Sequence, residues 1–257
     1  LASLADLYVN DAFGAAHRAH ASTTGITTHL PSYAGLLMEK EINMLGNSLN
    51  RSKGASVAVV GGAKVADKIH VLKNLTSKVD TILIGGGMLA AFLIANNRSG
   101  GAAEIKSEEV GAAKNLLDAG GAQVVLPADV VTGRTFQQNS IPTVYQATNV
   151  PHDALIMDIG PRATKEYARI LGIANTILWN GPMGVFEWEA FSKGSIGVAR
   201  AIAANLKATS VIGGGSTAEI VKSQNLSKQI THVSTGGGAS LEYLEGKILP
   251  GVAALDW

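Results

Sequence analysis

From about residue 55 onward, short apolar runs rich in β-branched residues alternate with segments whose apolar positions repeat at the helical period. The runs predict strands at residues 56–60, 81–84, 122–126, 154–158, 176–179, 210–212 and 231–234. The segments between them predict helices at residues 64–75, 107–119, 161–171, 192–206 and 240–244. Apolar strands that alternate with helices form mostly parallel sheets covered on both faces. The pattern therefore predicts an α/β fold with three layers.

The first 50 residues do not follow this alternation. The stretch LADLYVNDAFGAAHRAHAST predicts one short strand and then a polar loop, and residues 31–49 predict a single helix that begins at Pro31. We interpret residues 1–30 as the remnant of a second α/β domain and residues 31–50 as an interdomain connector helix. Residues 51–257 then form the large, Rossmann-like domain with a C-terminal tail.

Glycine pairs and triplets follow four of the predicted strands and precede a helix, at residues 61–62, 85–87, 213–215 and 236–238. They lie at the carboxyl edge of the predicted sheet, where open α/β folds bind ligands. Glycine costs roughly 0.5–1 kcal/mol relative to alanine in regular structure, so their number indicates that something approaches the backbone closely. Consecutive backbone N–H groups at a helix start bind anions, and phosphate is the natural candidate.

A dinucleotide cofactor is one alternative for these turns. The stretch GGGSTA at residues 213–218 satisfies the loose pattern G-x-G-x-x-A. That interpretation also needs an acidic residue about 20 positions later to hold the ribose. The residues at that place are HVST at 232–235, which disfavours a dinucleotide oxidoreductase. No glycine turn ends in Gly-Lys-Ser/Thr, so the P-loop pattern is absent as well.

Two cations follow the first glycine turn, in VVGGAKVADKIHVL. In a helix over residues 64–75, Lys64 and Lys68 lie on one face of the first two turns. Cations at a helix start oppose the helix dipole, so this position favours a bound anion, although solvated surface lysines are the alternative. His17 and His20 have the spacing of a metal pair, but no third ligand is evident and we reject a metal there.

The composition of the chain argues against several classes of function. The net charge is +1 and aromatic residues make up 5% of the chain, which argues against a nucleic-acid partner. The absence of cysteine excludes disulfides, thiolate catalysis and cysteine-based metal sites, and fits a cytoplasmic protein. The longest uncharged run, 81–97, is shorter than the ~20 apolar residues of a membrane span, so we expect no membrane partner. We expect no targeting signal, because no basic-then-apolar segment is visible at the start of the sequence.

A longer match decides between these interpretations. The block ILWNGPMGVFEWEAF at residues 177–191 resembles the signature of the phosphoglycerate kinase family. So do, in the family's order, LADLYVNDAFGAAHRAHAST, VVGGAKVADKI, IGGGM, LPADVV, MDIGP and HVSTGGGASLEYLEGKILPGVAAL. The resemblance covers the chain from end to end. It implies a monomeric glycolytic enzyme of two domains that close about a hinge. The implied reaction is reversible phosphoryl transfer between 1,3-bisphosphoglycerate and ADP, giving 3-phosphoglycerate and ATP.

The resemblance also implies a role for each matching position. Arg18, with His17 and His20 beside it, would contact the phosphate of phosphoglycerate. Lys64 would follow the transferring phosphoryl group. The backbone amides of the last glycine triplet would cradle that group, and they belong to Gly236, Gly237 and Gly238. The nucleotide would be bound by Gly61, Gly62, Lys68, Gly85, Gly86, Asn180, Pro182, Val185, Glu187, Gly213, Gly214, Gly215, Ser216 and Thr217.

Within the nucleotide site, Lys68 and Asn180 would face the phosphates. Pro182 and Val185 would form a wall of the base pocket, and Glu187 would accept hydrogen bonds from the ribose hydroxyls. Catalysis would then rest on positioning and electrostatics, without a covalent intermediate.

The implied cofactor is Mg²⁺, carried with ATP or ADP. The family ordinarily has aspartate where this chain has Ser216, so a neutral hydroxyl stands at the metal position. Glu219, one helical turn later, is the alternative carboxylate. The resemblance further implies that most of the amino-terminal substrate domain precedes Leu1 and is absent. Two hypotheses follow, a part of an active phosphotransferase or a nucleotide-binding module without activity on its own.

Overall fold

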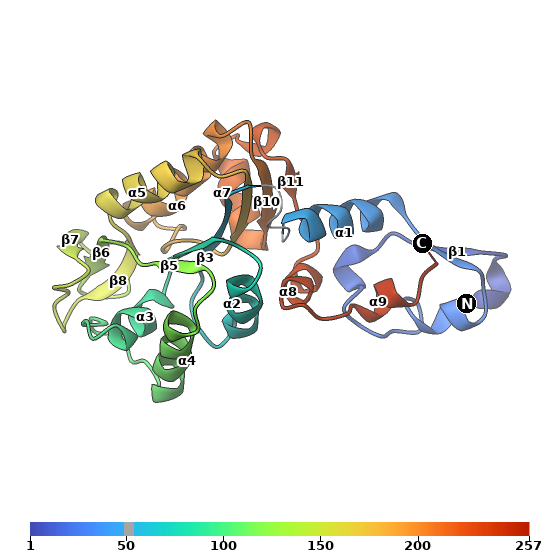
Figure 1. The fold of residues 1–257 in the computed structure, drawn as a ribbon, viewed down its shortest axis with the longest axis horizontal. Coiled ribbons are helices and arrows are strands. Elements are labelled where there is room, and N and C mark those ends of the chain that lie inside the picture. The colour runs from blue at the N-terminus through green and yellow to red at the C-terminus, as the bar shows by residue number, and fades with distance from the viewer. Residues whose placement is uncertain (49–53, 257) are drawn as a thin grey trace.

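A six-stranded sheet, parallel throughout, forms the centre of the larger lobe in the computed structural model, which describes residues 1–48 and 54–256 (Figure 1). Across the sheet the strands are β11 (His232–Val233), β10 (Thr209–Gly213), β9 (Thr176–Asn180), β3 (Ser56–Val60), β4 (Thr81–Ile84) and β5 (Gln123–Val125). Each corresponds to a predicted strand, and the α/β fold class is confirmed.

Helices cover both faces of this sheet, as the alternation of apolar strands and helices requires. One buried cluster joins Ala58 and Val60 to the helices α1 (Leu36–Ser48), α2 (Ile69–Thr76), α3 (Leu89–Ala95), α4 (Ser107–Asp118) and α8 (Gly238–Leu244). A second cluster joins Val57 and Val59 to α5 (Pro161–Gly172), α6 (Lys193–Ala204) and α7 (Gly215–Ser223). Successive residues of β3 therefore enter opposite cores, which is why the strand is apolar without alternation.

A second, antiparallel sheet departs from the prediction. The predicted strand at 154–158 is β8 (Leu155–Ile159), and it pairs with β6 (Asp129–Gly133) instead of joining the parallel sheet. On its other side β6 pairs antiparallel with β7 (Thr143–Gln146). The stretches 129–133 and 143–146 were not predicted as strands. A glycine ends β6 and exposed residues make up most of β7, so neither has the continuous apolar run of a strand buried on both faces.

The smaller lobe is built from both ends of the described chain. The predicted short strand is β1 (Tyr8–Asn10), and it pairs in parallel with β2 (Ser32–Ala34). The prediction of one helix from Pro31 is therefore wrong, because residues 32–34 are extended and α1 begins at Leu36. The carboxylate of Asp11 accepts hydrogen bonds from the N–H groups of Leu37 and Met38, and this cap fixes the start of α1.

α1 leads from the smaller lobe to the sheet, and the chain returns through α8 to α9 (Pro250–Ala253) in the smaller lobe (Figure 1). Residues 49 and 50 of the predicted connector, and residues 51–53 and 257 of the predicted large domain, lie outside the described residues. Within the described ranges, no helix combines the length and the hydropathy that a membrane crossing needs.

Candidate active site

Two neighbouring strands at the centre of the parallel sheet, β3 and β9, are followed by strands that lie on opposite sides of them. β3 and β9 pair with Val60 opposite Asn180. After β3 the chain continues to β4 on one side, and after β9 it continues to β10 on the other. The connections at their carboxyl ends therefore diverge, and such a point is where open α/β sheets bind ligands. We take this switch point as the candidate site.

The turn after β3 carries the two lysines, but not on a helix. α2 begins at Ile69, so the prediction that Lys64 and Lys68 lie on its first two turns is wrong. The physical reason is that the backbone of Gly62 is held by neighbouring turns. Its N–H donates to the carbonyl of Pro182 (3.2 Å) and its carbonyl accepts from the N–H of Met88 (3.2 Å). The chain becomes helical only after it leaves these contacts, and Lys64 is left exposed on the irregular turn.

Lys68 is half-buried at the start of α2, and its ammonium contacts the side-chain oxygen of Asn180. Burial lowers the pKa of Lys68, although the nearby carboxylates of Asp67 and Glu245 act in the opposite direction. The amide nitrogen of Asn180 is buried and has no hydrogen-bond partner within the described residues. A cation and a free amide donor thus meet at the end of β9, an arrangement that suits an anionic ligand.

The connection after β9, residues 181–187, touches both of the first two glycine turns. The carbonyl of Pro182 accepts from Gly62, and the carbonyl of Met183 accepts from the N–H of Gly86 (2.8 Å). Pro182 and Val185 are half-buried, and Glu187 is exposed. The structure therefore brings the predicted wall residues next to the predicted glycine turns, with Glu187 at the solvent side.

Two glycines are required by this contact between turns. A Cβ at Gly61 would overlap the carbonyl oxygens of Pro182 and Gly181. A Cβ at Gly86, whose φ is +71°, would overlap the backbone of Gly62. At Gly215 and Gly237, by contrast, an added Cβ would meet nothing within 4 Å. The first and second turns use Gly61 and Gly86 to pack together, whereas the third and fourth turns leave the backbone open at Gly215 and Gly237, even though Gly236 packs against Phe13.

The third turn, between β10 and α7, contains one predicted nucleotide side chain that is buried and one that is exposed. Thr217 is buried, and its hydroxyl donates to the carbonyl of Gly213 and accepts from the N–H of Gly181 (3.4 Å). It links this turn to the connection after β9. Ser216 and Glu219 are exposed. Over residues 1–48 and 54–256, no group of three or more His, Cys, Asp or Glu side chains could hold a metal ion.

The fourth turn is tied to α1 by a residue that sequence reasoning missed. The carboxylate of Glu41, which is fully buried, contacts the ring of His232 (2.9 Å) and accepts from the N–H of Thr235 (2.8 Å). Burial alone would raise the pKa of Glu41, but the hydrogen bonds from His232, Thr235 and Ser234 outweigh it and lower the pKa. Glu41 and His232 are 191 positions apart, so no local pattern joins them.

The basic residues of the smaller lobe lie beside this turn. A Cβ at Gly238 would lie 3.3 Å from Nε2 of His17, which places the ring against the turn. Arg18 is exposed, and its Nε donates to Nε2 of His17 (3.2 Å). Nδ1 of His17 is buried and has no hydrogen-bond partner within the described chain. The structure brings His17 to the glycine triplet with Arg18 hydrogen-bonded to it, and His20 is exposed nearby in the sequence.

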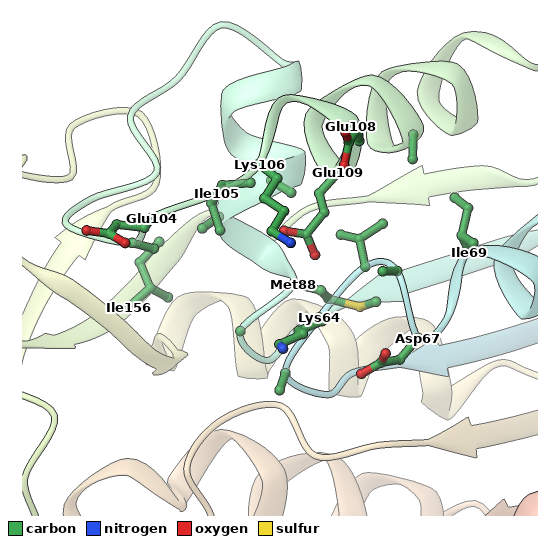
Figure 2. A pocket seen from close by; sticks show the side chains of 18 of the residues that line it. Lys64, Asp67, Ile69, Met88, Glu104, Ile105, Lys106, Glu108, Glu109 and Ile156 are labelled. Carbon is green, nitrogen blue, oxygen red and sulfur yellow. The ribbon is translucent and has the colours of Figure 1, made fainter.

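A pocket of about 770 Å³ opens beside the turn after β3 (Figure 2). Lys64 and Met88 lie on one side of it, and Ile105, Lys106 and Glu109 lie on the other. Leu155 and Ile156 of β8 also line it. Of the predicted nucleotide and catalytic residues only Lys64 lines it, so the pocket extends the switch point toward α4 and was not predicted.

Asp158, at the end of β8, is a second buried carboxyl that sequence reasoning did not single out. It is 1% exposed. Burial raises its pKa to about 7, against the lowering effect of hydrogen bonds from the N–H groups of Gly194 (2.7 Å) and Ile159 (2.9 Å). The sequence offered a signal in MDIGP, which the family resemblance used as a motif without giving the aspartate a role.

Comparison with known proteins decides what this arrangement belongs to. The sequence model of the family described as phosphoglycerate kinase matches residues 1–247. The chain belongs to the phosphoglycerate kinase family. The phosphoglycerate kinase of Herpetosiphon aurantiacus is 47% identical over an alignment of 259 positions, which covers all of this chain and 66% of that protein. The phosphoglycerate kinase of Staphylococcus haemolyticus is 49% identical over 256 residues, which is 99% of this chain and 64% of that protein.

Solved structures of the family agree in fold. The phosphoglycerate kinase of Coxiella burnetii superposes with a TM-score of 0.93 at 41% identity, over 98% of this chain and 66% of that one. The enzyme of Pyrococcus horikoshii gives a TM-score of 0.88 at 34% identity, over 99% of this chain and 64% of that one. The chain thus spans about two thirds of the length of the phosphoglycerate kinases that it matches.

Proposed function

We propose that this chain is the nucleotide-binding part of an enzyme that transfers a phosphoryl group reversibly between 1,3-bisphosphoglycerate and ADP. The observation that carries the proposal is the meeting of three features at one sheet edge. These are the switch point between β3 and β9, the cationic and amide donors of Lys68 and Asn180, and the open glycine turn beside His17. The chemistry of all three favours a ligand with several phosphates.

The nucleotide would lie across the first three turns. Lys68 and the free amide nitrogen of Asn180 would bind its phosphates. Pro182 and Val185 would contact the base, and Glu187, being exposed beside them, would accept from the ribose hydroxyls. The remaining residues that we assign to the nucleotide belong to the glycine turns, namely Gly61, Gly62, Gly85, Gly86, Gly213, Gly214, Gly215, Ser216 and Thr217.

The phosphoryl group would pass between the fourth turn and Lys64. The amides at Gly237 and Gly238 are at the start of α8, where backbone N–H groups favour negative charge. His17 and Arg18 would hold the phosphoglycerate on the smaller-lobe side. Lys64 is exposed and has the freedom to follow the moving charge, which spreads over the equatorial oxygens in the transition state.

Mg²⁺ would accompany the nucleotide and neutralise charge on its phosphates when bound. The exposed pair Ser216 and Glu219 on the first turns of α7 fits such an ion in part, with one neutral hydroxyl and one carboxylate. Because Mg²⁺ in phosphate sites keeps several waters and takes few protein ligands, this donor set suits an ion that arrives with the nucleotide.

We assign residues 1–30 to the substrate domain, 31–50 to the connector and 51–257 to the nucleotide-binding domain. The parent enzyme would work as a cytoplasmic monomer. Transfer requires groups from both domains to meet on closure. The chain spans 64% to 66% of the length of its relatives. We therefore propose that it binds nucleotide but does not catalyse phosphoryl transfer by itself.

The test is a calorimetric titration of the 257-residue chain with ADP, with and without Mg²⁺, beside a coupled assay for ATP formation. We expect a dissociation constant between about 1 μM and 1 mM and no turnover. NAD is the control ligand and should not compete. Failure to bind ADP would refute the proposed function, whereas substantial turnover would refute only the inactivity of the chain alone.

A further inference from the structure

The connection after β9 is held from behind by a buried serine. Ser195, in the first turn of α6, is fully buried, and its hydroxyl oxygen accepts from the N–H of Met183 at 2.9 Å. This is a contact between a side chain of α6 and the backbone of residues 181–187. Met183 itself is buried, and its carbonyl in turn accepts from Gly86. Met183 therefore links Ser195 to the second glycine turn through two hydrogen bonds.

Asp158 supports the same connection one residue further along. A Cβ at Gly184 would overlap the carboxylate, so the backbone of Gly184 rests directly against Asp158. A Cβ at Gly194 would overlap the same carboxylate from the α6 side. The neighbouring carbonyl, of Met157, accepts from the N–H of Val185 (2.8 Å). The carboxylate is thus clamped between the connection and the start of α6.

Neither side chain reaches the side of the connection that would meet a ligand. Ser195 and Asp158 are 0% and 1% exposed, and neither lines the pocket beside Lys64. Pro182, Val185 and Glu187 have accessible surface on the same seven-residue connection. The two buried groups therefore act on a ligand only by fixing the backbone from which these three side chains project.

We propose that Ser195 and Asp158 are positioning residues for the nucleoside half of the ligand. They set the backbone of residues 181–187 and thereby the places of Pro182, Val185 and Glu187. The proposal rests on the proposed function, because it assumes that this connection contacts the base and ribose. It leaves the phosphates to Lys68 and Asn180, which lie outside residues 181–187, so it separates the two halves of the nucleotide energetically.

The experiment compares two ligands in the 257-residue chain, ADP and inorganic tripolyphosphate, which has the phosphates without the nucleoside. Ser195→Ala removes the hydroxyl, and Asp158→Asn keeps the shape but replaces one of the two carboxylate oxygens that accept from the backbone N–H groups of Gly194 and Ile159. We expect ADP to bind about tenfold more weakly to each variant, since a buried hydrogen bond to the backbone is lost or weakened. Tripolyphosphate affinity should stay within about twofold, because the protein groups that we propose to bind its phosphates lie outside residues 181–187.

The matched control is Ser210→Ala. Ser210 is an equally buried serine whose hydroxyl oxygen accepts from the N–H of Thr231 (3.0 Å), away from the connection. It should leave both affinities unchanged. Ser195→Thr keeps the oxygen that accepts from Met183 and should restore most of the ADP affinity.

Equal losses for ADP and tripolyphosphate would show a general structural role and overturn the proposal. Unchanged ADP binding in both Ser195→Ala and Asp158→Asn would overturn it too. These outcomes are distinct from failure of the proposed function, in which the unaltered chain itself would not bind ADP.

Discussion

The two connections that meet at the switch point differ in how firmly they are held. In residues 181–187, backbone N–H groups of Gly181, Met183 and Val185 donate to Thr217, Ser195 and β8, respectively. In the turn after β3, none of residues 63–67 donates a backbone hydrogen bond within the described part of the chain. One side of the site is anchored to three elements, and the other is an open turn between two anchored ends.

The difference matches the tasks that we propose for the two sides. A wall for a base must keep its shape, because a ligand bound to a movable wall loses affinity to the entropy of ordering it. A cation that follows a phosphoryl group must move, and Lys64 sits on the side with few constraints. The same sheet edge thus supplies a fixed support and a movable charge, which sequence motifs alone do not distinguish.

The largest effect that we expect is the loss of phosphoryl transfer when the movable charge is removed. Lys64→Ala, tested with the remainder of the enzyme restored, should lower kcat by on the order of 10³-fold, as removal of a transition-state donor does. ADP affinity should change little, because Lys64 acts mainly after binding. Steady-state kinetics and an ADP titration measure the two quantities.

Lys106→Ala is the control for this variant, since Lys106 lies across the same pocket. It should leave kcat near its normal value. A drop in ADP affinity as large as the drop in kcat would contradict the division of tasks between the two sides.

The second effect concerns the fixed side and depends on pH. Because burial raises the pKa of Asp158 to about 7, the folded protein binds this proton more tightly than the unfolded chain does. The stabilisation is fully present below the unfolded pKa of about 3.8 and is lost as pH rises through about 7. Between pH 5 and 8 the free energy of unfolding should fall by roughly 3 kcal/mol.

Urea denaturation at several pH values measures this slope, and Asp158→Asn should flatten it because the residue no longer titrates. The same slope in the variant and in the unaltered chain would show that another group is responsible. Glu41 is the internal comparison, since its pKa is shifted downward and its contribution changes at acid pH instead.

The smallest effect is expected at the solvent side of the fixed connection. Glu187→Ala should weaken ADP binding by about 2 kcal/mol, because a charge-assisted hydrogen bond to the ribose is lost. Glu189→Ala, two residues further and also exposed, removes the same charge without the proposed contact. Calorimetry on both variants separates the contact from a general change in charge. Equal losses would mean that Glu187 does not meet the ribose.

The parallel sheet was predictable because its central strands are buried on both faces. Residues 57–60 and 82–84 are apolar throughout, and the predicted bounds 56–60 and 81–84 agree with β3 and β4. The glycine turns followed from them, since a strand that ends in glycines must place those glycines at the sheet edge. The predicted site residues could be named because the motifs match the family at those positions, with Ser216 as the departure.

The remaining features depend on contacts that no local pattern encodes. The start of α2 is delayed because Gly62 is bound by Pro182, more than a hundred residues away in the sequence. Glu41 and Ser195 stand in no local motif, and the motif MDIGP does not reveal the role of Asp158, because each acts through a backbone group that the fold brings close. Extended segments that are mostly exposed, such as β7, lack the apolar signal.

The return of the chain to its first residues has a consequence for synthesis. The side-chain amide of Asn10 donates to the carbonyl of Gly251, 241 positions later, and the N–H of Asp256 donates to Ser32. A ribosome that adds about 5–20 residues per second needs on the order of 10–50 s to connect the first pair. Throughout that interval β1 and β2 lack the segment that packs on them. The larger lobe therefore completes most of its core first, and the smaller lobe is the last part of the described chain to close.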